Sequence, residues 1–164
     1  MESKSKKMYF TDLKDMLRQT GEVYGDRPAY KFKTDEAGKF RIITHKKFRE
    51  EINELGTALI SMGLKGKRIA VISENRYEWI STYLANIIAG NDVVILPNSL
   101  KAEMISKIIE KYQVNTIFYS SVYRIKIIKI NEYRKQKNDL KPLNLINFDK
   151  EKSLLTNDYN KIMN

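Results

Sequence analysis

The sequence of 164 residues contains no cysteine and only one histidine, His45. Without cysteine neither a disulfide framework nor a thiolate metal site is possible, and a reducing compartment is compatible with the chain. One histidine excludes a multi-histidine metal site, and a serine–histidine–aspartate arrangement would have to use His45. Because His45 follows Thr44 in the first turn of an expected helix, we interpret it as a surface residue.

Glycine-rich patterns of the kind that bind phosphate are missing from the sequence. The sequence has seven glycines, and no set of them has Walker or dinucleotide spacing. Residues 63–67, Gly-Leu-Lys-Gly-Lys, are superficially similar to a backbone-clamping GxxG loop of RNA-binding domains. We favour the alternative, a turn that joins a helix end to a strand.

Long apolar runs are also missing. The most apolar stretch, residues 79–97, is interrupted by serine, asparagine, glycine and aspartate, which are costly in a bilayer. The lysine-bearing start of the chain is followed by polar residues instead of an apolar segment, so we expect no secretory signal. The sequence therefore predicts a cytoplasmic, soluble chain.

Acidic residues are outnumbered, with 20 Asp and Glu against 30 Lys and Arg and a formal net charge of +10. Residues 124–141 are the most basic segment and interleave isoleucines with lysines and arginines. Such a segment fits peripheral contact with an anionic membrane, or with nucleic acid, which we consider the less favoured partner. The favoured interpretation is a solvated basic helix face.

The residues that are present predict one folded lobe, since hydrophobic residues make up 42% of the chain. Helical periodicity is expected over residues 11–19, 45–62, 77–89 and 102–112, and strands over 28–33, 40–44, 68–73, 93–96, 116–119 and 143–148. Thr11 or Asp12 is a candidate cap for the first helix. Residues 122–137 fit a helix about as well as a strand.

Three of these predictions are specific enough to fail. The apolar blocks 69–72 and 93–96 are expected to be buried on both faces of a parallel sheet. The apolar face of the helix over 102–112 is expected to consist of Met104, Ile105, Ile108 and Ile109. The fold class is α/β: a β-hairpin plus a doubly wound, mostly parallel sheet of roughly four or five strands.

Ligands of such sheets bind beyond the carboxyl ends of the strands, here the loops after Ile72, Leu96 and Tyr119. The loop of residues 73–76, Ser-Glu-Asn-Arg, is the most polar of them. One interpretation is a carboxylate–guanidinium pair that contacts a ligand. The favoured one is that Ser73 or Asn75 caps the next helix, with Glu74 near its positive end. Trp79 is interpreted as part of an amphipathic helix that anchors the sheet, in preference to an aromatic ligand wall.

The order of several motifs resembles the opening of AMP-forming acyl-CoA synthetases, with long-chain fatty-acid–CoA ligases as the closest match. The segments are Tyr-Gly-Asp-Arg-Pro-Ala-Tyr at 24–30, Ile-Thr-His-Lys-Lys-Phe at 43–48, the stretch from Met-Gly-Leu at 62–64 to Glu-Trp at 78–79, and Ile-Ala-Gly at 88–90 followed by the block ending at Pro97. The resemblance implies an N-terminal helical segment at 1–23, part of the N-terminal lobe of an AMP-binding domain at 24–148, and a weakly patterned tail at 149–164.

The same resemblance implies that the complete enzyme uses ATP, Mg²⁺ and CoA to activate a fatty acid as acyl-adenylate. The family's phosphate loop should follow a segment like 143–148, and it is not found in this sequence, so we expect a fragment that is inactive alone. No catalytic, cofactor-binding or metal residue is assigned. The expected partner is the remainder of the synthetase, and self-association is a further possibility; a stand-alone interaction module and a basic module remain as alternative functions.

Overall fold

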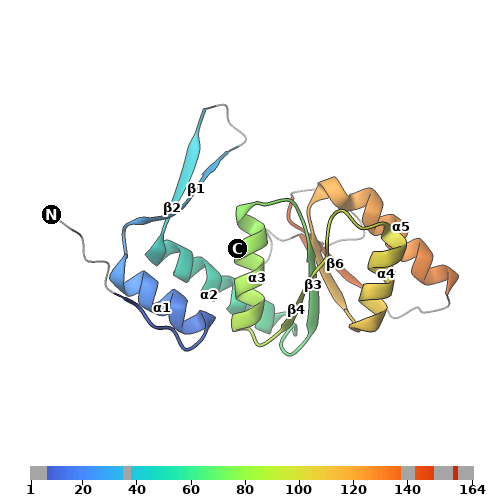
Figure 1. Cartoon of the computed structure of the whole chain (residues 1–164), viewed down its shortest axis with the longest axis horizontal. Coiled ribbons are helices and arrows are strands. Elements are labelled where there is room, and N and C mark those ends of the chain that lie inside the picture. Colours follow the sequence, from blue (N-terminus) through green and yellow to red (C-terminus); the bar gives the residue numbers. More distant parts are fainter. Residues whose placement is uncertain (1–6, 35–37, 138–142, 150–156, 159–164) are drawn as a thin grey trace. The chain divides into compact units, whose positions relative to one another are not determined.

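The computed structural model describes residues 7–34, 38–137, 143–149 and 157–158. The chain divides into two compact units, Met1–Glu51 and Ile52–Asn164. Figure 1 shows the order of the elements, with a hairpin in the first unit and a sheet with helices on both faces in the second. The predicted α/β class, with a hairpin and a parallel sheet, is confirmed.

The first unit contains helix α1 (Leu13–Val23) and the antiparallel hairpin of β1 (Pro28–Lys33) and β2 (Phe40–Thr44). Asp12 caps α1, since its carboxylate accepts the N–H of Asp15 at 2.7 Å. The helix runs four residues beyond the predicted end at residue 19. Gly38 has a positive φ of 77°, as the predicted turn requires, while residues 35–37 of that turn lie outside the described part of the chain.

Helix α2 (His45–Ser61) begins in the first unit and continues into the second. The Thr44 hydroxyl accepts the N–H of Lys47 at 3.2 Å and so caps the start of the helix. Gly63, after the end of the helix, takes the left-handed conformation with a φ of 75°. The apolar positions Ile52, Leu55 and Leu59 are fully buried, as their helical spacing predicts.

The second unit is built on a parallel sheet with the strand order β4-β3-β5-β6-β7. Its strands, in chain order, are β3 (Arg68–Ile72), β4 (Asp92–Ile95), β5 (Thr116–Tyr119), β6 (Asn144–Asn147) and β7 (Asn157–Asp158). β3 pairs in parallel with both β4 and β5, which is the adjacency that the sequence predicts. Of the tail at 149–164, only Asp149, Asn157 and Asp158 are described.

Helices cover both faces of this sheet. Figure 1 shows α3 (Tyr77–Ile88) on one face and α4 (Ala102–Lys111) with α5 (Arg124–Gln136) on the other. A short 3₁₀ turn, Ser121–Tyr123, leads into α5, so the segment that fitted helix and strand equally well is a helix. Alternation along β3 sends Ala70 and Ile72 into the core beneath α4 and α5. α2 approaches α3 closely at Gly56, where an added Cβ would lie 3.4 Å from the carbonyl oxygen of Ala85.

Two burial predictions are wrong. The block predicted as a second fully buried strand forms β4, whose residues are only partly buried or exposed, Ile95 being 50% exposed. The reason is that β4 is an edge strand, a position that its apolar composition does not reveal. Met104 is 47% exposed and lies off the apolar face of α4, whereas Ile105 and Ile109 are in the core.

The two neighbours Met104 and Ile105 therefore make a matched test of how α4 packs. Ile105→Ala should lower the free energy of unfolding by about 2–5 kcal/mol, because it leaves a cavity in the core. Met104→Ala should change it by less than about 0.5 kcal/mol, because the side chain is largely in water. Urea unfolding of both variants measures the difference, and equal losses would contradict this placement of the helix.

Candidate functional site

The strand order places a topological switch point between β3 and β5. The chain leaves β3 through α3 to reach β4 on one side, and returns through α4 to β5 on the other side. The loops after β3 and β5 therefore diverge from two adjacent strands, which is where open α/β sheets bind their ligands. Polar side chains fill this point.

The first contact there joins the loops after β3 and β5. The hydroxyl of Ser120 donates to Oε2 of Glu74 at 2.5 Å, a distance typical of a charge-assisted hydrogen bond. Ser120 is fully buried, and Ser73 adds a longer hydrogen bond of 3.4 Å to the same carboxylate oxygen. The Glu74 carboxylate thus joins the loops after β3 and β5 at the switch point.

Arg76 is the centre of the second set of contacts. Its guanidinium donates to Oδ1 of Asp149 and to Oε2 of Glu78, both at 2.7 Å, and lies 3.4 Å from Oε1 of Glu74. It also stands 5.9 Å from the centre of the Phe148 ring. Burial alone lowers the pKa of Arg76, but the hydrogen bonds to Glu78 and Asp149 outweigh burial and raise it. One cation therefore joins the loop after β3 to the segment that leaves β6.

A third set of contacts ties the end of β6 to the turn after β5. Asp149 accepts the backbone N–H of Ser121 at 2.7 Å, and Asn147 donates its amide to the Ser121 hydroxyl at 3.0 Å. The Asp149 N–H in turn donates to the side-chain oxygen of Asn147 at 2.9 Å. The side chains of the loops after β3, β5 and β6 satisfy one another, so we interpret this network as a device that fixes the loops.

These contacts correct the favoured interpretation of the loop of residues 73–76. The residue that caps α3 is Arg76, and it makes no side-chain capping bond, so neither Ser73 nor Asn75 is the cap. The alternative carboxylate–guanidinium pair does exist, between Glu74 and Arg76. Arg76 also pairs at 2.7 Å with Asp149, which comes from a different strand end.

A second feature lies at the start of α4 and α5, near the carboxyl ends of β4 and β5. It is an open groove of about 610 Å³ between the two helices, lined by both apolar and basic side chains. Lys126 crosses part of it and donates to the carbonyl oxygens of Asn98, at 2.5 Å, and Leu100, at 2.9 Å. The lining residues are Ser99, Leu100, Lys101, Ala102, Glu103, Val122, Tyr123, Ile125, Lys126, Lys129 and Tyr133.

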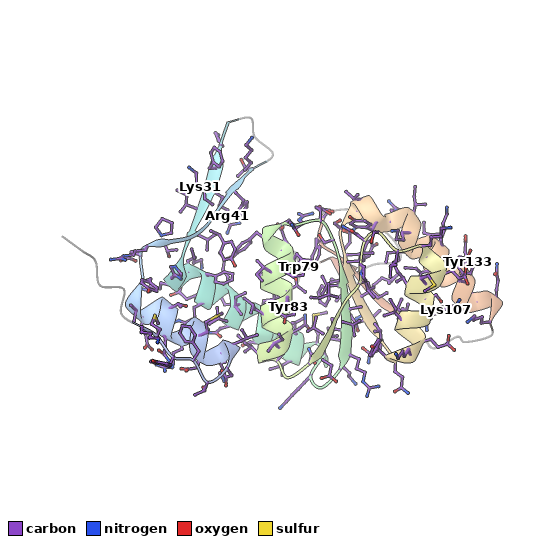
Figure 2. The ribbon with its side chains drawn as sticks, in the orientation of Figure 1. Lys31, Arg41, Trp79, Tyr83, Lys107 and Tyr133 are labelled. Carbon is purple, nitrogen blue, oxygen red and sulfur yellow. The ribbon has the colours of Figure 1, made fainter. Side chains whose placement is uncertain are left out.

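The other residues considered from the sequence, His45, Gly63, Gly66 and Trp79, have contacts or backbone conformations that are typical of structural roles. His45 packs its ring 5.3 Å from that of Tyr24, and burial lowers its pKa. Gly63 and Gly66 have φ values of 75° and 66° in the turn between α2 and β3, as expected of a connection. Trp79 stacks on Tyr83, one turn further along α3, with ring centres 5.8 Å apart; Figure 2 labels both side chains on this helix.

The part of the chain that the structure describes, with its gaps, offers no cluster of metal ligands and no membrane-spanning helix. Within the described ranges, no group of three or more His, Cys, Asp or Glu side chains is arranged to hold a metal ion. No helix among the described residues combines the length and apolarity needed to cross a bilayer.

Comparison with known proteins gives the context of this lobe. The family model of the AMP-binding enzymes matches residues 17–161, which is most of the chain. The chain belongs to the AMP-binding enzyme family. The predicted resemblance to AMP-forming acyl-CoA synthetases is thereby confirmed.

Individual relatives agree with this membership. Fatty acyl-CoA synthetase B of Dictyostelium discoideum is 28% identical over 114 residues, which are 66% of this chain and 17% of that protein. An anthranilate CoA ligase in complex with anthranoyl-AMP superposes with a TM-score of 0.77 at 17% identity, covering 99% of this chain and 29% of the ligase. A benzoate CoA ligase from Burkholderia xenovorans LB400 superposes with a TM-score of 0.70 at 15% identity, covering 92% and 27%.

The chain thus spans 17–29% of the length of these relatives. Within it, sequence reasoning located the polar loop after β3 but missed its partners Ser120, Ser121, Asn147 and Asp149. A signal for them exists in the sequence, because Ser120 and Ser121 follow directly on the buried block of β5, and Asp149 follows closely on that of β6.

The network gives a pH-dependent prediction. Burial raises the pKa of the Asp149 carboxyl, but the Ser121 N–H and the Arg76 guanidinium outweigh it and hold the pKa below the ordinary value of 3.8. A lowered pKa in the folded state stabilises the fold above the unfolded value, and this contribution is lost as the pH falls through the folded pKa. Asp149→Asn should therefore cost about 1–2 kcal/mol at neutral pH and progressively less as the pH falls below about 4.

Urea unfolding at neutral and acidic pH measures this cost. The matched control is Asp92→Asn, because the Asp92 side chain is 83% exposed and its ion pair with Arg68 is long, at 3.9 Å. Equal effects of the two substitutions at every pH would contradict a stabilising role for the Asp149 contacts.

Proposed function

We propose that this chain is the N-terminal part of an ATP-dependent, AMP-forming fatty acid–CoA ligase that acts on long-chain acids. The family match over residues 17–161 carries the proposal. The fatty acyl substrate class is supported by the name of the Dictyostelium relative and by the motif order between residues 24 and 97. ATP, Mg²⁺ and CoA are the cofactors proposed for the complete enzyme.

The chemistry of such a ligase sets what this lobe alone is able to do. Activation of a carboxylate by ATP develops charge at the α-phosphate, which positioned cations and N–H donors must stabilise. In the described residues the cation nearest the switch point, Arg76, is already engaged with three carboxylates, Glu74, Glu78 and Asp149. The seven glycines have no phosphate-binding spacing. We therefore propose that the lobe organises the fold and does not catalyse the reaction by itself.

The direct test is acyl-adenylate formation by the purified 164-residue chain in monodisperse form. With ATP, Mg²⁺ and a long-chain fatty acid we expect no AMP or pyrophosphate above the level of a protein-free control, because Arg76 is engaged with carboxylates and the glycines of the sequence have no phosphate-binding spacing. A complete AMP-forming ligase assayed in parallel shows that the conditions support turnover. Sustained turnover by the chain alone would overturn the proposal that it is inactive.

A partner for the lobe is part of the same proposal. Large apolar side chains are exposed in each of the two units, Ile42 at 53% in the first and Ile60 at 44% and Ile95 at 50% in the second, and apolar groups left in water favour association where they gather into patches. We expect the isolated chain to self-associate with rising concentration, and the remainder of the synthetase, added as a separate polypeptide, to suppress this by binding. Sedimentation velocity over a concentration series measures both effects; a chain that stays monomeric and does not bind that polypeptide contradicts the expectation.

A further inference from the structure

Helix α5 and the turn before it expose an unusual set of aliphatic side chains. Val122 is 75% exposed, Ile125 is 70% exposed and Ile128 is 50% exposed. Three- and four-residue spacing places Ile125, Ile128 and Lys129 together on the side of α5 away from the core. We call these four residues, Val122, Ile125, Ile128 and Lys129, the outer face of α5.

The core side of the same helix is already complete. Ile127 and Ile130 are buried against α4 and the sheet, within one contiguous apolar cluster. A surface helix needs only one apolar stripe to pack on its domain, and a helix that is apolar on both sides is normally covered on both sides. The outer isoleucines therefore add nothing to the folding of this unit, which makes them candidates for contact with something else.

The charges around this face have one predominant sign. Lys129 lies on the outer face itself, and Arg124 and Lys135 are exposed beside it. Lys101 and Lys126 line the groove that Val122, Ile125 and Lys129 also line, and there Glu103 pairs with Lys107 at 2.9 Å. Glu132, four residues after Ile128 and three after Lys129, lies on the same side of α5 as the outer face, where Lys129, Arg124 and Lys135 outnumber it. Figure 2 labels Lys107 on α4 and Tyr133 on α5, which mark the two helices that border the groove. The surface combines exposed aliphatic groups with an excess of cations.

From this combination we infer that the outer face of α5 binds the surface of an anionic lipid bilayer. Branched aliphatic side chains enter the boundary between headgroups and acyl chains, while lysines and arginines beside them stay at the level of the anionic headgroups. Nucleic acid would use the same cations but leave the isoleucines in water, and binding of single strands relies on aromatic stacking, which valine and isoleucine do not offer. The bilayer is the partner that uses both kinds of side chain, and this inference is independent of the proposed function.

The experiment is sedimentation of the full chain with vesicles of pure phosphatidylcholine and of equimolar phosphatidylcholine and phosphatidylserine. We expect binding to the anionic vesicles that weakens as salt is raised, and little binding to the neutral ones. The double variant Ile125→Ser/Ile128→Ser should lower the partition coefficient about tenfold or more. Lys129→Gln/Lys135→Gln should lower it by about tenfold as well, through the headgroup attraction.

Matched controls come from the end of α2 and from the turn that follows it, about 60 residues before α5 in the sequence. Ile60→Ser/Met62→Ser removes two side chains that are 44% and 40% exposed near the end of α2, and Lys65→Gln/Lys67→Gln removes two exposed lysines from the following turn. Both controls should bind anionic vesicles like the unaltered chain. All substituted side chains are exposed. A thermal melt of each variant identifies any that has lost its fold. If the isoleucine variant is lost in this way, the lysine variant of α5 still tests the inference.

Three outcomes would overturn the inference. The first is equal binding to neutral and anionic vesicles. The second is a loss of binding in the controls as large as in the α5 variants. The third is binding to an oligonucleotide that is tighter than to vesicles and unaffected by Ile125→Ser/Ile128→Ser, which would identify a nucleic-acid surface instead.

Discussion

The parallel pairing of β3 on both of its edges is the constraint on which the larger unit depends. Residues 69–72 are completely buried, and the strand bonds to β4 on one side and to β5 on the other. A parallel pair requires a crossover, and right-handed crossovers that run in opposite directions across the sheet, from β3 to β4 and from β4 back past β3 to β5, place α3 and α4 on opposite faces (Figure 1). It also creates the switch point at which the loops after β3 and β5 meet. The network of Glu74, Arg76 and Asp149 forms because these two loops meet there and because β6, paired with β5, brings Asp149 to the same edge of the sheet.

Much of this architecture is predictable, because local patterns encode it directly. The blocks at 69–72 and 116–119 are short, apolar and bounded by polar residues, and both form the expected strands. The run at 93–96 looks the same in sequence, yet β4 is half exposed. Position in the sheet decides burial, and that position depends on which strand pairs with which over long separations. The prediction that Met104 belongs to the apolar face of α4 is wrong for a related reason, since helical periodicity alone does not determine where the buried stripe of a helix ends.

The candidate site was predictable in location but not in chemistry. The loop at 73–76 is polar and follows a buried strand, so the sequence points to it. Its partners are distant in the chain, Ser120 being 46 residues from Glu74 and Asp149 being 73 residues from Arg76. Local reasoning therefore favoured a helix cap, which uses only neighbouring residues, over contacts that the folded sheet supplies. A guanidinium facing three carboxylates stabilises loops in a fixed arrangement, and such an arrangement differs physically from an open anion site.

One property of α5 connects the failure of sequence reasoning with the inference drawn from the structure. Isoleucines at 125, 127, 128 and 130 lie on both sides of the helix, so the sequence shows neither a clean helical period nor a clean alternation. That ambiguity left the segment open between helix and strand. In the structure Ile127 and Ile130 belong to the core, and Ile125 and Ile128 are left in water beside Lys129. A helix with a single packed face has a clear helical period of apolar residues, so the lack of one here reflects a second apolar surface on α5. Exposed apolar surface lowers solubility and is typical of sites that bind a partner.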